Sequence, residues 1–216
     1  MHIVNRLCTA ILGFLIPFSL SSQVFEKGMV LVKNYSPIEN GFGAWNYAIA
    51  RDHRGVMYFG NNDDGVLEFD GVSWRKISVP KGIVWSLASD SEGRIYVGSE
   101  GDFGMLVPDA SGKLQYRSFL PFVPDSAKLF SSVYNIFCHR GNVYFSSTEY
   151  LFTWTGKTVS VYAFPRNLNS YWSFLASGKI YHGSISRGLL FFDGKDFIPA
   201  PGGEGFVSNP VQAVLP

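Results

Sequence analysis

Four aromatic residues occupy matching places in a repeated pattern, where their rings could stack on a flat ligand. They are Tyr47, Trp85, Tyr134 and Trp172, and each is followed by a small or polar residue and then by an apolar one. Aromatic faces stack on other planar groups, so a ring of such residues could hold a saccharide or another flat molecule. The plainer interpretation is that the rings pack between neighbouring sheets, and the sequence leaves both open.

Polar residues at two other matching places could bind a cation or sugar hydroxyls. They fall in Asn61–Gly65 and Ser99–Asp102, and the candidates are Asn62, Asp63, Glu100 and Asp102. Short turns also favour Asn, Asp and Gly, and the oxygen spacing of an EF-type calcium loop is absent. We therefore expect turn chemistry first and a binding site second.

The remaining charged residues give no catalytic constellation. Arg166 and Arg187 could recognise an anionic group, although solubilising surface charge is the simpler role. His53 and His139 fall in expected turns and His182 in an expected strand, and none has metal-ligand spacing with another. We expect no cofactor and no metal ion.

A glycine followed three residues later by a tyrosine recurs along the chain. The tyrosines are Tyr58, Tyr96, Tyr144 and Tyr181, which stand 38, 48 and 37 residues apart. This period is typical of four-stranded propeller blades, and the longest interval predicts an inserted loop.

Each repeat contains four short apolar stretches with the alternation of strands. Asp52 to Gly55 and Asp90 to Gly93 predict hairpin turns, and Asp70-Gly71 and Asp193-Gly194 predict tight turns between third and fourth strands. Sheets of this size bury their faces by packing radially. The sequence therefore predicts an all-β fold, a β-propeller of four-stranded antiparallel blades.

Four blades and the start of a fifth are visible, so we expect the ring to be incomplete in this chain. We place a lead-in at 23–44, in which Met29 to Lys33 could be a ring-closing strand, and the propeller at 45–216. The expected blades are 45–80, 81–120, 131–165 and 168–200, with the start of the next at 204–216.

Residues 1–22 have the pattern of a secretory signal peptide. Arg6 precedes an apolar run from Leu7 to Leu20, and small residues follow. A retained membrane anchor is the alternative, but the run is shorter than the roughly 20 residues a spanning helix needs. Cleavage near Gln23 would leave Cys138 as the one thiol, which we expect to be a small buried apolar residue.

The runs Asn46 to Ile77 and Trp85 to Phe119 resemble the two-component-regulator propeller family, with "GVLEFDG" and "GDFGML" among the most specific segments. Members are extracytoplasmic sensory propellers of bacterial membrane-spanning regulators. Many continue into a triple-tyrosine domain, a membrane helix and a histidine kinase or helix-turn-helix output. The third and fourth repeats depart from the pattern because they lack the Asp-x-x-Gly turn. The resemblance transfers no binding residues.

The sequence thus favours a non-enzymatic sensory module that binds an oligosaccharide or another small ligand. The resemblance implies an exported, periplasmic or extracellular location, tethering through downstream membrane and output domains, and a role in signal transduction. With a net charge of +1 and no basic runs, we expect no direct nucleic-acid contact. A secreted propeller lyase or glycoside hydrolase, or a protein-docking scaffold, is the alternative, because fold does not choose among them.

Overall fold

The computed structural model describes residues 32–37, 41–165 and 172–215. The chain divides into two compact units, Met1–Asn34 and Tyr35–Pro216, and every described strand belongs to the second. The expected signal peptide, Arg166, and Met29 to Leu31 of the expected closing strand lie outside the described residues. The described parts of the chain contain no helix long and apolar enough to cross a membrane.

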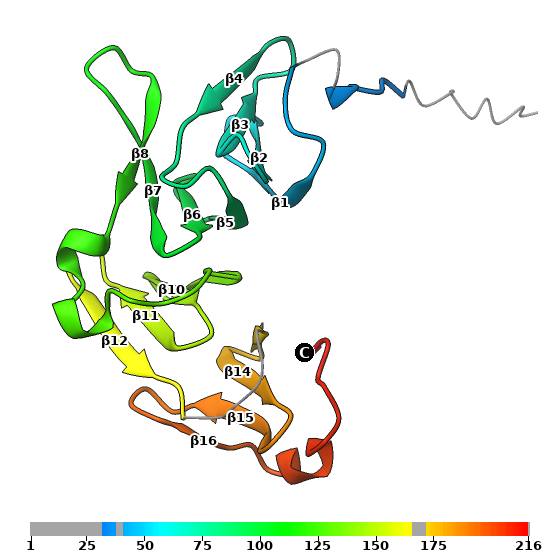
Figure 1. Ribbon diagram of the computed structural model, residues 1–216, viewed down its shortest axis with the longest axis vertical. Helices are drawn as coiled ribbons and strands as arrows, with labels where there is room; N and C mark the ends of the chain where they lie inside the picture. Colours follow the sequence, from blue (N-terminus) through cyan, green and yellow to red (C-terminus); the bar gives the residue numbers. More distant parts are fainter. Residues whose placement is uncertain (1–31, 38–40, 166–171, 216) are drawn as a thin grey trace, which may run out of the picture. The chain divides into compact units, whose positions relative to one another are not determined.

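Tyr35–Pro216 folds into four antiparallel sheets of four strands each, which we call blades 1 to 4 and which confirm the predicted all-β fold (Figure 1). Each blade is a meander of consecutive strands. Blades 1 and 2 contain β1 (Asn46–Arg51), β2 (Met57–Asn61), β3 (Val66–Phe69), β4 (Trp74–Ile77), β5 (Val84–Ser89), β6 (Ile95–Ser99), β7 (Asp102–Pro108) and β8 (Leu114–Ser118). Blades 3 and 4 contain β9 (Asn135–His139), β10 (Asn142–Ser146), β11 (Tyr150–Trp154), β12 (Val159–Ala163), β13 (Ser173–Ala176), β14 (Lys179–Ser184), β15 (Gly188–Phe192) and β16 (Phe197–Pro199).

The blades pack face to face in chain order, and the first strands of consecutive blades are in contact. One apolar cluster joins blades 1 and 2, a second joins blades 2 and 3, and a third joins blades 3 and 4. The repeated tyrosines take part: Tyr58 and Tyr96 are almost fully buried in the first and second clusters. The arrangement is that of a propeller, and no closed ring is formed by the described residues.

Glycines on the second strands let neighbouring blades approach closely. A Cβ atom at Gly98 would lie 2.2 Å from Ser86 Oγ and 2.8 Å from the carbonyl oxygen of Val133, and one at Gly60 would lie 2.9 Å from the carbonyl oxygen of Val84. Val84 and Val133 therefore occupy equivalent places on the next blade. A side chain at either glycine would force the blades apart.

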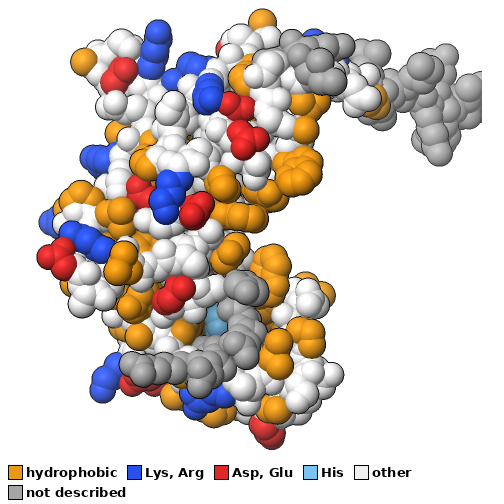
Figure 2. All heavy atoms as spheres, viewed as in Figure 1, with side chains coloured by type: hydrophobic (Ala, Val, Ile, Leu, Met, Phe, Trp, Pro, Cys, Tyr) orange, Lys and Arg blue, Asp and Glu red, His pale blue; other side chains and the backbone are white. Residues whose placement is uncertain are grey.

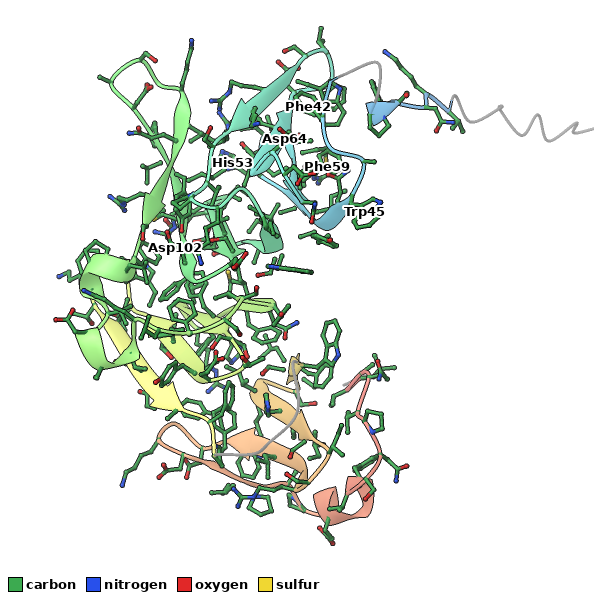
Figure 3. The ribbon with its side chains drawn as sticks, in the orientation of Figure 1. Phe42, Trp45, His53, Phe59, Asp64 and Asp102 are labelled. Atoms are coloured by element: carbon green, nitrogen blue, oxygen red, sulfur yellow. The ribbon has the colours of Figure 1, made fainter. Side chains whose placement is uncertain are left out.

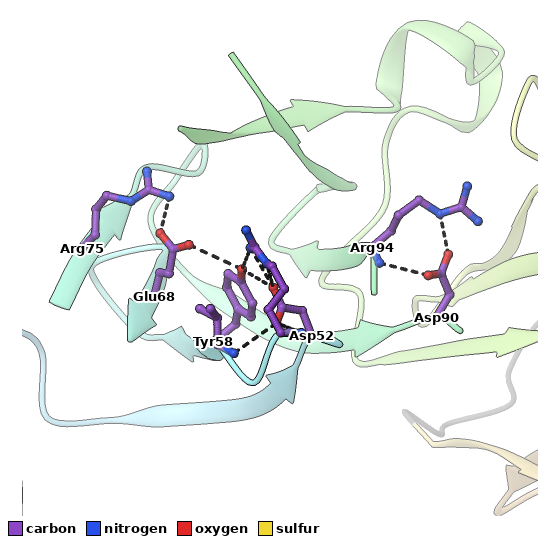
Figure 4. Close-up of polar contacts among 8 residues, drawn as sticks. Asp52, Tyr58, Glu68, Arg75, Asp90 and Arg94 are labelled. Carbon is purple, nitrogen blue, oxygen red and sulfur yellow. Dashed lines mark hydrogen bonds and ion pairs between the residues drawn. The ribbon is translucent and has the colours of Figure 1, made fainter. Parts of the chain in front are cut away.

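The first hairpins of blades 1 and 2 each contain a polar network centred on an aspartate (Figure 4). Asp52 Oδ1 accepts hydrogen bonds from the backbone N–H of Arg54 (2.9 Å) and of Val56 (3.0 Å), and the Tyr58 hydroxyl donates to Asp52 Oδ2 (3.2 Å). Burial opposes ionisation, but the bonds from Arg54 and Val56 outweigh it and lower the pKa of Asp52. These bonds close the predicted turn over a buried tyrosine.

Blade 2 repeats this arrangement. Asp90 Oδ1 accepts from the backbone N–H of Glu92 and Arg94, and Tyr96 donates to Asp90 Oδ2 at 3.1 Å. In blade 1 the network extends through Glu68, which pairs with Arg75 on the neighbouring strand.

The first hairpins of blades 3 and 4 are tighter. Their two-residue turns, Arg140-Gly141 and Ser177-Gly178, have positive φ at both positions (50° and 78°, 47° and 74°), as type I′ turns require. The expectation that His139 lies in a turn is wrong, because His139 is the last residue of β9 and pairs with Asn142. Because the turn contains only Arg140 and Gly141, strand β9 extends through His139.

The long interval between the second and third tyrosines contains the expected insertion. Residues 119–134 include two short 3₁₀ helices, η1 (Leu120–Phe122) and η2 (Asp125–Ala127). Phe119 is fully buried and stacks on Trp154 with a centroid distance of 4.2 Å. The insertion thus adds to the core between blades 2 and 3.

The expected start of a fifth blade contains no strand. A 3₁₀ helix, η3 (Gly203–Phe206), follows blade 4, and residues 207–215 have no regular structure. Val211 nevertheless lies against Gly183, where a Cβ atom would be 3.1 Å from Val211 Cβ. Val211 thus repeats the contacts that Val84 and Val133 make with Gly60 and Gly98. Val32 and Lys33, the described part of the expected closing strand, also carry no strand.

Candidate functional site

The four repeated aromatic residues line one groove of about 590 Å³ at one end of the first strands. Tyr47 is the second residue of β1 and Trp85 the second residue of β5, while Tyr134 and Trp172 immediately precede β9 and β13. Hydrophobic side chains gather along this side of the blades in Figure 2. The repeat therefore brings equivalent residues of four blades to a single surface.

The aromatic rings pack on one another and also remain accessible. Tyr47 and Trp85 stack with a centroid distance of 4.4 Å and an interplanar angle of 18°, and Trp85 meets Tyr134 edge-on at 5.4 Å. Tyr47 is still 40% exposed and Trp172 45% exposed. Packing between blades accounts for part of each ring, and the exposed part is available to a ligand.

Aliphatic residues, which the sequence analysis did not single out, complete the groove. Ile49 is 60% exposed, and Leu87 and Ile136 line the groove from the next two blades. Each stands two residues after an aromatic member, and both members of each pair line the groove. The signal was present in the repeated aromatic, small and apolar triplets.

The second-to-third strand connection of blade 1 is hydrogen-bonded to one lining residue of the groove, Tyr47. The Tyr47 hydroxyl donates a hydrogen bond to Asn62 Oδ1 at 3.0 Å, and Asn62 Nδ2 donates to Asp63 Oδ1 at 3.0 Å. Asp64, next in the chain, accepts from the backbone N–H of Gly43 at 2.7 Å and pairs with Lys76, which lowers its pKa. Asn62 and Asp63 are thus joined to the predicted aromatic set.

The corresponding connection of blade 2 differs from the prediction. Asp102 is the first residue of β7 rather than a connection residue, and it lies inside the blade (Figure 3). Its Oδ1 accepts from Ser118 Oγ and from the backbone N–H of Phe103, both at 2.7 Å. Burial raises the pKa of Asp102. The side chain links β7 to Ser118, the last residue of β8.

Glu100 stays in the connection, where it pairs with Lys81 at 3.5 Å. In blade 3 the carboxylate at this end is Glu149, which accepts from Ser131 N–H and Ser147 Oγ. Arg187 is exposed in the turn between β14 and β15, with its backbone N–H donating to Ser184 Oγ. The structure thus links neither Glu100 nor Arg187 to the aromatic groove.

Among the described residues there is no cluster of three or more His, Cys, Asp or Glu side chains that could hold a metal ion. His182 lies in a strand, as expected, and is fully buried: it stacks on Phe164 at 4.1 Å, and Ser173 Oγ is 3.0 Å from its Nδ1. Burial lowers the pKa of His182 to about 4, so the imidazole is neutral at physiological pH.

A second cavity, of about 230 Å³, lies at the opposite end of the first strands, between the hairpins of blades 2 and 3. Its lining is charged, with Asp90 and Arg94 from blade 2 and Arg140 from blade 3. Arg94 and Asp90 are already paired, at 2.6 Å. Cys138 also lines this cavity, and burial raises the pKa of its thiol to about 11.

Solved structures with the same fold include several propellers. The WD40 β-propeller domain of Doa1 has a TM-score of 0.50 at 13% identity, over 71% of this chain and 52% of that one. The fold is a β-propeller. No protein-family model matches the chain, and no curated protein sequence matches it either.

Two further similarities concern propellers of different function. The extracellular domain of BT4673 from B. thetaiotaomicron, assigned to a one-component system in one structure and to a hybrid two-component system in another, has a TM-score of 0.59 at 15% identity. Virginiamycin B lyase from Staphylococcus aureus has a TM-score of 0.54 at 15% identity.

The chain spans only part of both proteins. The alignment with BT4673 covers 75% of this chain and 22% of that one, and the alignment with the lyase covers 72% and 56%. At these identities the similarity establishes the propeller fold alone, and the function has to be argued from the residues of the site.

Proposed function

We propose that this chain is an exported propeller that binds a small ligand in the aromatic groove and acts as the sensory part of a signal-transduction regulator. The observation that carries the proposal is the convergence of Tyr47, Trp85, Tyr134 and Trp172, from four blades, on one groove. Its volume of about 590 Å³ falls within the range of small-molecule sites.

The sensory role is supported by the resemblance of Asn46 to Ile77 and Trp85 to Phe119 to the two-component-regulator propellers, and by the shared fold with the extracellular domain of BT4673. The leader-like residues 1–22 support export. Downstream membrane and output domains of the same protein would then transmit the signal. An oligosaccharide or another small ligand is the expected partner of the groove.

A secreted propeller lyase is the second candidate, because virginiamycin B lyase shares the fold. Catalysis of that kind needs an acid and a base at the bound substrate. Four of the carboxylates at or beside the second-to-third strand connections are engaged in contacts within the fold: Asp64 with Lys76, Glu100 with Lys81, Asp102 with Ser118 and Glu149 with Ser131. Asp63 accepts a hydrogen bond from Asn62 and lies outside the groove lining. The described lining offers rings, aliphatic groups, one serine and one asparagine, which favours binding.

A thermal-shift screen of the 216-residue chain with neutral oligosaccharides and small aromatic compounds would test the proposal. Trp172→Ala should weaken the binding of any hit about tenfold, because an exposed stacking face is lost. Trp45→Ala is the matched control, since Trp45 is 67% exposed and lies outside the groove lining. Equal effects of both variants, or no hits at all, would refute the groove as a ligand site.

A further inference from the structure

The groove surface is more apolar than a saccharide site requires. Tyr47, Ile49 and Trp172 are between 40% and 60% exposed, and Leu87 and Ile136 lie between them on the following blades. None of the described lining residues has a charged side chain. Exposed apolar side chains that lie together are a feature of sites that bind another apolar surface.

Several polar groups of the lining are already used by the fold or covered by it. Ser86 is buried, and its hydroxyl donates to the carbonyl oxygen of Val133 at 2.8 Å. Asn135 Oδ1 accepts from the backbone N–H of Ser173 at 3.0 Å. Trp85 Nε1 is covered by surrounding atoms and has no hydrogen-bond partner among the described residues, so it offers no donor at the groove surface.

A saccharide would gain little here beyond ring stacking. Its hydroxyl groups would lose water against Ile49, Leu87 and Ile136, and burying a hydroxyl without a new hydrogen bond is unfavourable. A compound with two or more rings and few hydrogen-bonding groups would lose no such bonds. It would cover the exposed faces of Tyr47 and Trp172 together with the aliphatic residues between them.

We infer that the groove takes an uncharged, predominantly apolar ring compound rather than an oligosaccharide. This inference rests on the proposed function and specifies the ligand class of the same site. The expected occupant lies against the Tyr47 and Trp172 rings and also contacts Ile49, the most exposed aliphatic residue of the lining.

The test compares two uncharged probes on the whole chain: 1-N-phenylnaphthylamine, followed by its fluorescence, and cellohexaose, followed by calorimetry. Ile49→Asp places a charge in the groove and should weaken binding of the naphthylamine at least about tenfold. Val72→Asp is the matched control, because Val72 is 90% exposed in the β3–β4 turn and lies outside the groove. Circular dichroism of both variants checks that they remain folded.

We expect the naphthylamine to bind the chain and Val72→Asp about equally, Ile49→Asp at least tenfold more weakly, and cellohexaose at least tenfold more weakly than the naphthylamine. Tighter binding of cellohexaose that Trp172→Ala abolishes would overturn the inference and leave the proposed function standing. Binding of neither probe, or equal loss in the two aspartate variants, would overturn both. If Ile49→Asp unfolds, Ile49→Ser replaces it, with the same expected direction.

Discussion

The two ends of the first hairpins use their side chains in opposite ways. At the turn end of blades 1 and 2, Asp52 and Asp90 are held by backbone N–H groups, an arginine and a buried tyrosine. At the groove end, Tyr47 and Trp172 keep 40% and 45% of their surface exposed. Buried polar groups with all their hydrogen bonds made stabilise a fold, whereas exposed aromatic surface adds nothing to folding and is available for binding. The contrast separates an end of the blades whose polar groups stabilise the fold from the end at which we propose that a ligand binds.

The turn end is not uniform along the chain. Blades 3 and 4 replace the longer aspartate turns with two-residue turns, and Cys138 and Ala176 stand near the positions of the aspartates. The aromatic groove, by contrast, draws on all four blades. The first hairpins are therefore closed by an aspartate network in blades 1 and 2 and by a two-residue turn in blades 3 and 4. All four blades contribute residues to the groove.

The largest expected effect is at the turn end of blade 1. Asp52→Ala removes four hydrogen bonds, accepted from Arg54 N–H, Val56 N–H, the Tyr58 hydroxyl and the Nε of the exposed Arg54 side chain. The first three are worth about 1 kcal/mol each. We expect the free energy of unfolding to fall by about 3 kcal/mol in urea denaturation.

Asp70→Ala is the control for this substitution. Asp70 also accepts two backbone hydrogen bonds in a turn, from Val72 and Ser73, but it is exposed. We expect a clearly smaller loss. A loss as large as that of Asp52→Ala would show that burial of the network adds nothing to the turn itself.

The stability of the chain should also depend on pH through these carboxylates. The pKa values of Asp52 and Asp90 are lowered: burial raises them, and hydrogen bonds from Arg54 and Arg94 outweigh it. Since the native state releases these protons more readily than the unfolded state, the contribution is present above about pH 4 and is lost as pH falls further. Urea midpoints measured from about pH 7 to about pH 2.5 should therefore decrease steeply below about pH 4, and less steeply in the Asp52→Asn, Asp90→Asn double variant.

Asp102 should act in the reverse direction. Burial raises its pKa, so the native state binds this proton more tightly than the unfolded state does, and the group disfavours folding as pH rises above about 4. Asp102→Asn should consequently make the decrease in acid steeper. A shallower decrease would mean that Asp102 is ionised in the native state in acid, against the assigned burial effect.

The smallest expected effect compares equivalent tyrosines. Tyr58→Phe removes the hydroxyl that donates to Asp52 and should cost about 1 kcal/mol. The hydroxyl of Tyr144 in blade 3 makes no hydrogen bond within the described residues, so Tyr144→Phe should change the unfolding free energy by less than about 0.5 kcal/mol. Equal costs would contradict the distinction between the two kinds of hairpin.

Local signals in the sequence predicted much of this structure. The Gly-x-x-Tyr repeat located the second strand of every blade, and the Asp-Gly pairs located the β3–β4 and β15–β16 turns. The period alone placed Tyr47, Trp85, Tyr134 and Trp172 at one end of the blades. Such features depend on residues close together in the sequence, and the same pattern recurs in each repeat, which makes it easier to recognise.

What the sequence could not predict depends on distant contacts. Asp102 is buried and accepts a hydrogen bond from Ser118, 16 residues away, and its place directly after Gly101 gave no sign of this contact. The end of β9 at His139 depends on a two-residue turn rather than a longer one. The sequence predicted the start of a fifth blade at 204–216. Val211 does contact Gly183 of blade 4, but residues 207–215 form no strand.

The most direct test of the groove as the ligand site is a crystal structure of the chain with the tightest-binding compound from the screen. We expect its electron density between Tyr47 and Trp172, against Ile49. Density in the charged cavity at the turn end, beside Asp90 and Arg140, would contradict the assignment of the two ends and the function proposed for the groove.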